Sequence, residues 1–246
     1  PDSNSGFSLM ELMIAIFLST VLTTGIVQLV AGSVSAYRLQ LSQSHMEESS
    51  RYAYDVLRSH VAQAGYRHEP WRPETKIPAL TEESLNGDSP TGDQLGLQRW
   101  STKNCYGNDN TVTDKNGDPE FYILQTLFHV NASDNLAITC RYGPDPASLK
   151  TQINNFGLVE GVESLQVLYA EDRNGEKNAD RWVTGRGWQK EASIRAVKVG
   201  LLLSTTQATG HAPSKQLTLL DETIGPPLDG HLRKTSTFTV AIHGRL

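Results

Sequence analysis

One glutamate stands at the edge of a long apolar run, where a charge is costly. The 25 residues from Leu12 to Ala36 carry no charge, and Glu11 directly precedes them. An ionised carboxylate at that membrane depth is destabilising unless it is solvated at the headgroup boundary or paired with a cation. The simplest such cation is a free α-amino group of another subunit. If the chain is cut between Gly6 and Phe7, the new amine and Glu11 share one helix face. We therefore interpret Glu11 as an assembly residue.

The uncharged run is long enough to cross a membrane. As a helix rising about 1.5 Å per residue, it measures about 37 Å, against about 30 Å for a hydrocarbon core. A cleaved secretory signal is shorter and has basic residues in front, whereas all 22 Lys and Arg residues lie at Arg38 or beyond. A buried core helix is less favoured, because the rest of a chain with a mean hydropathy of −0.38 is too polar to surround a helix that is apolar on all faces. A single transmembrane helix is the preferred interpretation, and the same hydropathy excludes a multi-span protein.

Two cysteines and two acidic loops could also carry chemistry. Cys105 and Cys140 lie 35 residues apart without a CxxC spacing, which argues against zinc. In an exported chain we expect them to form a disulfide worth about 3–4 kcal/mol, the alternative being two buried thiols. The first acidic loop has oxygen side chains at calcium-like relative positions 1, 3, 5 and 9, in Asp172, Asn174, Glu176 and Asp180. A second loop, 114–118, repeats part of this spacing, and Asn-Gly turns explain both loops equally well. Apart from this calcium hypothesis, no cofactor is expected.

No motif of a catalytic site is present. The sequence lacks a Gly-x-Ser-x-Gly elbow, an HExxH motif, a glycine-rich phosphate loop and a Cys/His cluster. The formal charge of −5 and the lack of a dense basic patch give no sign of a nucleic-acid partner. We therefore predict that the chain is not an enzyme.

The elements that position these residues begin with one long helix. Helical spacing continues to Gly65, a plausible terminator, and predicts a helix over about 7–64 that is exposed in its polar middle, 42–50. Its last part should pack on a globular head through Tyr52, Val56, Leu57 and Val61. His45 and His60 are interpreted as surface or boundary residues. Strands are predicted around 95–100 and over 121–130, 136–142, 162–169, 194–203, 217–220 and 235–242, forming an antiparallel sheet on the helix.

The segment from Gly6 to Glu11, followed by an apolar helix, resembles the class III signal of type IV pilins and pseudopilins. Further blocks resemble the minor pilins of the PilW type: residues 51–57 running into 63–66, then 161–169, 180–182, 194–203 and 237–242. The resemblance implies that a prepilin peptidase cuts after Gly6 and methylates Phe7. It also implies that Glu11 guides assembly by pairing with a neighbour's amino-terminal amine.

The resemblance implies an α+β, type IV pilin-like fold, in which a long amino-terminal helix packs on an antiparallel β-sheet head with irregular loops. We expect residues 1–6 to be a leader remnant, 7–36 the transmembrane and assembly helix, 37–65 its amphipathic continuation, and 66–246 a periplasmic head. The expected function is that of a minor pilin that primes pilus assembly and sits at or near the tip. Expected partners are other minor pilins, the major pilin, the prepilin peptidase, the inner-membrane assembly platform and a tip adhesin.

Two other functions fit the same residues. A minor pseudopilin of type II secretion, similar to the pseudopilin J type, shares the signal and the long helix. A membrane-tethered periplasmic binding protein would use the helix only as an anchor. In each case we expect a single-pass chain in the bacterial inner membrane with a periplasmic head, and a pilin would then move into an extracellular pilus.

Overall fold

A computed structural model describes residues 8–84, 92–185, 187–206, 208, 216–225 and 229–243. The chain divides into two compact units, Pro1–His45 and Met46–Leu246, each of which is described by itself. Helix α1, Leu9–Gln63, contributes to both units. The sequence predicts a boundary after residue 36, where the composition changes from uncharged to polar. The two units divide ten residues later, at Met46, which is the first buried residue of the helix.

The two ends of α1 have recognisable stop signals. Ser8 precedes the helix, and its hydroxyl accepts a hydrogen bond from the backbone N–H of Met10 at 3.4 Å, as an N-cap residue does. At the other end, Gly65 has φ of +75°, a conformation that glycine adopts without steric cost. The N–H of Gly65 donates to the carbonyl of Gln98 at 2.8 Å. The sequence-based prediction of Gly65 as the terminator is therefore confirmed, and this bond ties the helix end to the first strand.

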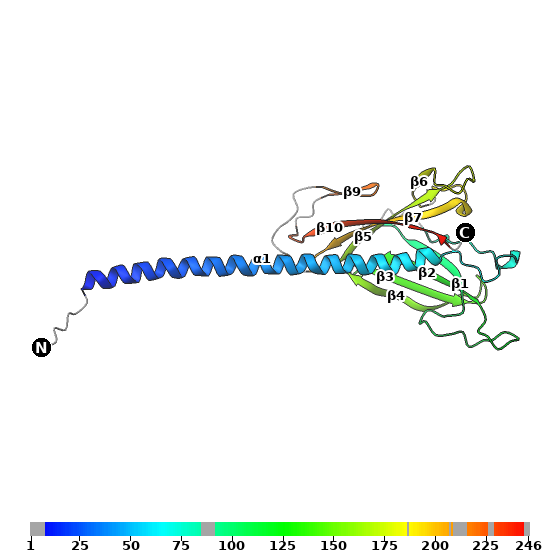
Figure 1. Ribbon diagram of the computed structural model, residues 1–246, viewed down its shortest axis with the longest axis horizontal. Coiled ribbons are helices and arrows are strands. Elements are labelled where there is room, and N and C mark those ends of the chain that lie inside the picture. The colour runs from blue at the N-terminus through cyan, green and yellow to red at the C-terminus, as the bar shows by residue number, and fades with distance from the viewer. Residues whose placement is uncertain are drawn as a thin grey trace. The chain divides into compact units, whose positions relative to one another are not determined.

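The described residues of the head include two four-stranded antiparallel sheets (Figure 1). The first has the order β1-β2-β3-β4, with each strand beside its neighbour in sequence. The second has the order β10-β7-β5-β6. The strands of the first sheet are β1 (Leu95–Ser101), β2 (Tyr122–Val130), β3 (Asn135–Gly143) and β4 (Lys150–Glu160). Those of the second are β5 (Val162–Glu171), β6 (Arg181–Val183), β7 (Ile194–Ser204) and β10 (Arg233–Ala241).

Smaller elements fill the connections. Strands β8 (Leu217–Leu219) and β9 (Glu222–Ile224) form a two-stranded hairpin, and two short 3₁₀ turns cover Pro73–Thr75 and Glu191–Ser193. Leu219 and Leu220 lie against Gly200 of β7, where an added Cβ would be 2.9–3.0 Å from their side chains. The glycine thus lets the hairpin approach the second sheet closely.

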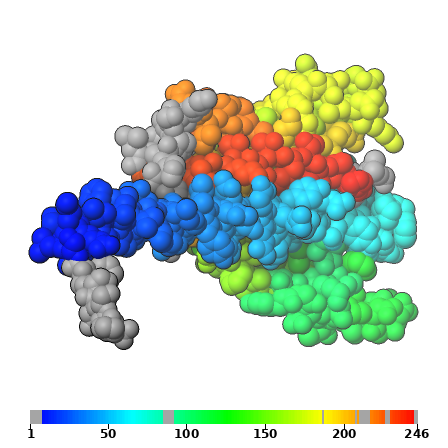
Figure 2. Space-filling view, turned by 60° about the vertical axis from the view of Figure 1, so that its left-hand side comes forward, coloured from blue at the N-terminus to red at the C-terminus, as the bar shows by residue number. Residues whose placement is uncertain are grey.

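One hydrophobic core joins the end of α1 to both sheets. Leu57 and Val61 are fully buried among side chains that include Phe128 of β2 and Val199 of β7. Figure 2 shows the part of α1 from Met46 onward between β10 and the β1–β4 sheet. Because this helix face completes the core, the head cannot bury its apolar side chains without it.

Several sequence-based predictions about the buried face of α1 and about the strands are wrong in detail. Tyr52 is 51% exposed, and Ala53 occupies the core position beside it. Met46 is buried although the surrounding segment is polar. Strand β4 was not predicted, because its polar residues are mostly exposed and it is irregular, with Asn155 at φ of +49°. Two sheets replace the single sheet expected from the sequence: β4 and β5 belong to different sheets, although only Gly161, with φ of +73°, separates them.

Candidate assembly interface

The first part of α1 presents apolar side chains on every side. Its large hydrophobic residues from Leu9 to Val34 are exposed, and α1 is the one helix in the described residues that is long and apolar enough to cross a membrane. Hydroxyl side chains within it hydrogen-bond to the helix's own backbone: Ser19 to Ala15 at 2.8 Å and Thr23 to Ser19 at 2.7 Å. Thr24 and Ser33 do the same at 2.8 and 2.9 Å. Because these hydroxyl groups already have hydrogen-bond partners within the helix, they can lie in an apolar environment.

Glu11 lies in the first turn of this helix, three residues after Ser8. The N–H of Glu11 donates to the carbonyl of Ser8 at 3.1 Å, so the two residues bracket the helix start. This Ser-x-x-Glu spacing is that of a capping box, which the sequence interpretation above missed. Among the described residues, Glu11 has no ion-pair partner. Its charge is thus available to another molecule, while its position also suits the helix terminus.

Two of the predicted site residues cannot be placed. Gly6 and Phe7, the predicted cleavage and methylation positions, lie outside the described residues. The structure describes the chain from Ser8, so the geometry around the predicted cut begins one residue after Phe7.

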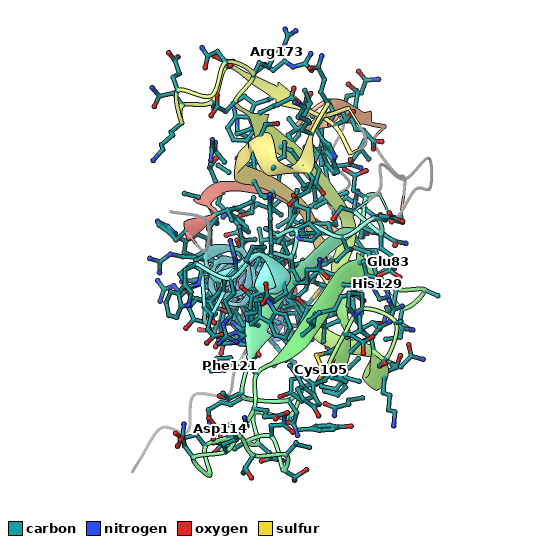
Figure 3. All side chains as sticks on the ribbon, turned by 90° about the vertical axis from the view of Figure 1, so that its right-hand side faces the viewer. Glu83, Cys105, Asp114, Phe121, His129 and Arg173 are labelled. Atoms are coloured by element: carbon teal, nitrogen blue, oxygen red, sulfur yellow. A yellow bond between two sulfur atoms is a disulfide. The ribbon has the colours of Figure 1, made fainter. Side chains whose placement is uncertain are left out.

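The two cysteines form a disulfide, with an S–S distance of 2.05 Å. Cys140 lies on β3 and Cys105 follows β1, so the bond fixes the loop after β1 to the sheet (Figure 3). Cys140 packs with Leu124 and Tyr142 in a small cluster separate from the main core. The predicted disulfide is present, and it belongs to a small cluster that lies beside the main core, with Ile153 packed against both.

The acidic loop after β5 is arranged as a turn. Buried Asp172 pairs with Arg195 of β7 at 2.8 Å and accepts the N–H groups of Gly175 and Lys177 at 2.7 and 2.9 Å. Its pKa is lowered, chiefly by the hydrogen bond from Arg195. Asp180 accepts the N–H of Arg173 at 2.7 Å. Asn174 accepts the N–H of Glu176 at 3.1 Å.

The second acidic loop has the same character. Asp114 accepts the N–H groups of Asn116 and Asp118 at 2.8 and 3.0 Å, and the bond from Asp118 is the main cause of its lowered pKa. Figure 3 shows Asp114 and Arg173 at opposite ends of the head, so the two loops do not combine into one site. In the described residues no group of three or more His, Cys, Asp or Glu could hold a metal ion. The calcium hypothesis stays a prediction without structural support.

A partly buried histidine marks the helix end. His60 Nδ1 lies 3.5 Å from the hydroxyl of Thr126, and its ring packs edge-on against Phe128 with 5.1 Å between centroids. Burial, and then the positive charge of Arg99, lower its pKa from 6.5 to about 4. The interpretation of His60 as a boundary residue thus holds, but its environment keeps it neutral.

This lowered pKa predicts a pH dependence of stability. Between the unfolded pKa of 6.5 and the folded pKa of about 4, the unfolded chain binds the proton more readily. The contribution of neutral His60 to the free energy of unfolding is therefore fully present above pH 6.5. It falls by about 3 kcal/mol as the pH decreases from 6.5 through the folded pKa of about 4. We expect His60→Gln to lose less stability than wild type over this range, measured as chemical unfolding of the full chain in detergent. Parallel pH profiles of the two proteins would contradict the assignment.

Comparison with known proteins identifies this arrangement. Residues 122–243, which include β2 to β5, β7 and β10, match the family described as type IV pilus-assembly protein W. Residues 2–27, which include Glu11 and the start of α1, match the prokaryotic N-terminal methylation motif. The chain belongs to the PilW type of type IV pilins. Its amino-terminal motif and exposed apolar helix are accordingly those of a membrane-anchored pilin, and its family and fold are those of structural proteins.

A solved structure supports the fold of this pilin. A type IV-like pilin from Thermus thermophilus superimposes with a TM-score of 0.50 and 21% sequence identity, covering 81% of this chain and 96% of its own. At that identity the similarity concerns the fold alone: a long amino-terminal helix with antiparallel sheets. No match was found among curated protein sequences.

Proposed function

We propose that this pilin helps prime type IV pilus assembly and is incorporated at or near the pilus tip with other minor pilins. The observation that carries the proposal is the surface of α1 before residue 37: apolar on every side, with one carboxylate in its first turn. An anchor needs the apolar surface but has no need of the carboxylate. A helix that packs against other helices in a fixed axial register needs both the apolar surface and the carboxylate.

In this proposal the chain is first cut between Gly6 and Phe7, and Phe7 is methylated. Support comes from the match of residues 2–27 to the N-terminal methylation motif. Glu11 then pairs with the terminal amine of a neighbouring subunit and sets the axial register. The mass of the amino-terminal peptide of the membrane-bound protein would test this step, because a methylated Phe7 defines both the cut and the modification.

The disulfide suits a head that leaves the cell. A disulfide persists in an oxidising compartment, which favours a periplasmic and then extracellular location. The pilin would thus begin in the inner membrane as a single-pass protein and meet the assembly platform there. Its partners would be the other minor pilins, the major pilin and, at the tip, an adhesin.

Deletion of the gene would test the proposed function. We expect loss of surface pili with normal protein secretion, and restoration of pili by the wild-type gene. Epitope-tagged protein should be detected at filament ends by immunogold electron microscopy. Loss of secretion with normal pili would instead assign the chain to a type II secretion pseudopilus. Labelling along the whole filament would contradict the tip location.

A further inference from the structure

A hollow of about 480 Å³ lies where α1 ends on the first sheet. Its lining includes Gln63 of the helix, Tyr66 of the following loop, Arg99 and Trp100 of β1, and Phe121. Figure 3 views this end of the head, with Phe121 beside the end of the helix. The hollow belongs entirely to the unit formed by Met46–Leu246.

Arg99 in this hollow is a cation with no carboxylate partner among the described residues. One terminal nitrogen donates to the side-chain oxygen of Gln63. The buried Nε has no protein hydrogen-bond partner, and no acidic group among the described residues forms an ion pair with Arg99. Burial lowers its pKa. A half-buried guanidinium in this state is destabilising, and a carboxylate from outside would satisfy it.

Some arginines elsewhere in the head do have carboxylate partners. Arg233, beside another hollow of about 420 Å³, is held by both Glu163 and Asp229 of the same chain. Arg195 and Arg181 likewise have buried carboxylate partners, Asp172 and Glu171. Unlike these arginines, Arg99 has no carboxylate partner among the described residues, so its guanidinium is available to a carboxylate from another subunit.

The walls of the hollow are rigid and aromatic. The indole N–H of Trp100 donates to the carbonyl of Thr75 at 2.7 Å, and its backbone N–H donates to the carbonyl of Tyr66 at 3.0 Å. Phe121 is stacked on His68, with 4.3 Å between the ring centroids. Tyr66 is 45% exposed. Tyr, Trp and Arg are the residues in which the binding energy of protein interfaces is concentrated, and pre-ordered side chains lower the entropic cost of binding.

We propose that this hollow docks an acidic side chain, carried on an apolar segment, from a neighbouring pilin subunit. The carboxylate would accept hydrogen bonds from the guanidinium of Arg99, and the adjoining apolar groups would contact Tyr66, Trp100 and Phe121. Charge complementarity selects an anion, and the aromatic walls favour a protein segment over a free inorganic ion. The inference rests on the proposed function, since it specifies how the head would contact its neighbour in the filament.

The test compares full-length Arg99→Met with Lys150→Met in cells that make pili. Methionine keeps much of the apolar stem of either side chain, and Lys150 lines a different hollow, of about 570 Å³. We expect Arg99→Met to lower the amount of chain in purified filaments by at least about tenfold. The control should incorporate like wild type. The thermal unfolding midpoint of Arg99→Met in detergent should equal or exceed that of wild type, because the variant removes an uncompensated charge.

Three outcomes would overturn the inference. The first is normal incorporation of Arg99→Met. The second is a lowered unfolding midpoint that accounts for reduced incorporation, which would make Arg99 a structural residue only. The third is stabilisation of wild type, but not of Arg99→Met, by inorganic phosphate together with normal incorporation, which would assign the hollow to a free anion. If wild-type protein is itself absent from filaments, the proposed function fails before this test is reached.

Discussion

Replacing Glu11 with glutamine should lower the incorporation of this pilin into filaments by about a hundredfold. Glutamine keeps the length and hydrogen-bonding capacity of the side chain, and it serves in a capping box as glutamate does. The substitution therefore preserves the helix start that Ser8 and Glu11 bracket, and removes only the charge. If Glu11 pairs with a neighbour's amine inside a layer of apolar helices, the amine then loses its partner in a medium of low dielectric constant.

The control for this prediction is the pair of variants Glu11→Ala and Ser8→Ala. Glu11→Ala removes the charge together with any hydrogen bond of the side chain to the helix start, and should be as defective as Glu11→Gln. Ser8→Ala removes the N-cap hydroxyl alone and should cost only about 1 kcal/mol of helix stability, with incorporation near wild type. Quantitative immunoblots of sheared filaments and of membranes give the measurement. Should Glu11→Gln incorporate normally while Glu11→Ala does not, Glu11 would be a capping residue and the charge-pairing role would be wrong.

Leu57→Ala should destabilise the head by about 2–5 kcal/mol. Leu57 is 0% exposed and lies where α1 meets side chains of both sheets, so truncation leaves a cavity that neither sheet can close alone. Chemical unfolding of the full chain in detergent, followed by tryptophan fluorescence, measures the difference. Because the loss occurs in the core and not at the amino-terminal motif, membrane insertion and amino-terminal processing should be unchanged.

Tyr52→Ala is the matched control, five residues earlier on the same helix. Tyr52 is 51% exposed, and its replacement should change stability by no more than about 0.5 kcal/mol. Equal losses in the two variants would mean that the helix does not pack on the head through the face that the structure assigns.

The pair also shows where helical periodicity is insufficient. Tyr52, Val56 and Leu57 all follow a helical repeat, but a side chain as large as tyrosine at the margin of the buried stripe can turn toward solvent. Ala53, the next residue, is 0% exposed and belongs to the hydrophobic core instead. Sequence spacing therefore predicts the approximate direction of the buried face, but not which residues at its margin are buried.

The strands differed in how well their sequences predicted them. Strands β5 and β7 are buried and rich in Leu and Val, and their approximate bounds followed from composition. Strand β4 is an edge strand with exposed polar residues and a shifted register beside β3, so its sequence carries little strand signal. The division into two sheets depends on which strands pair, and pairing between distant segments is not encoded in local pattern.

The candidate site was predictable to a similar degree. Glu11 was identified from one charge beside an apolar run, and the disulfide from two isolated cysteines in an exported chain. The sequence did not single out Arg99, because an arginine in a strand is ordinary until the structure shows that no described carboxylate pairs with it. Only a three-dimensional account of partners distinguishes a satisfied charge from an available one.

The hydroxyl groups along α1 bear on how the helix moves from the lipid bilayer to a place among neighbouring helices. Ser19, Thr23, Thr24 and Ser33 hydrogen-bond to carbonyls of their own helix. Lipid chains and neighbouring helices can therefore replace each other around this segment with no internal hydrogen bond broken or formed. The work of extraction would then fall on exchanging apolar contacts, on the amide of Gln28 and on moving the charge of Glu11. Because Glu11 is the charged group among these, its carboxylate is the group whose surroundings change most when the subunit leaves the bilayer.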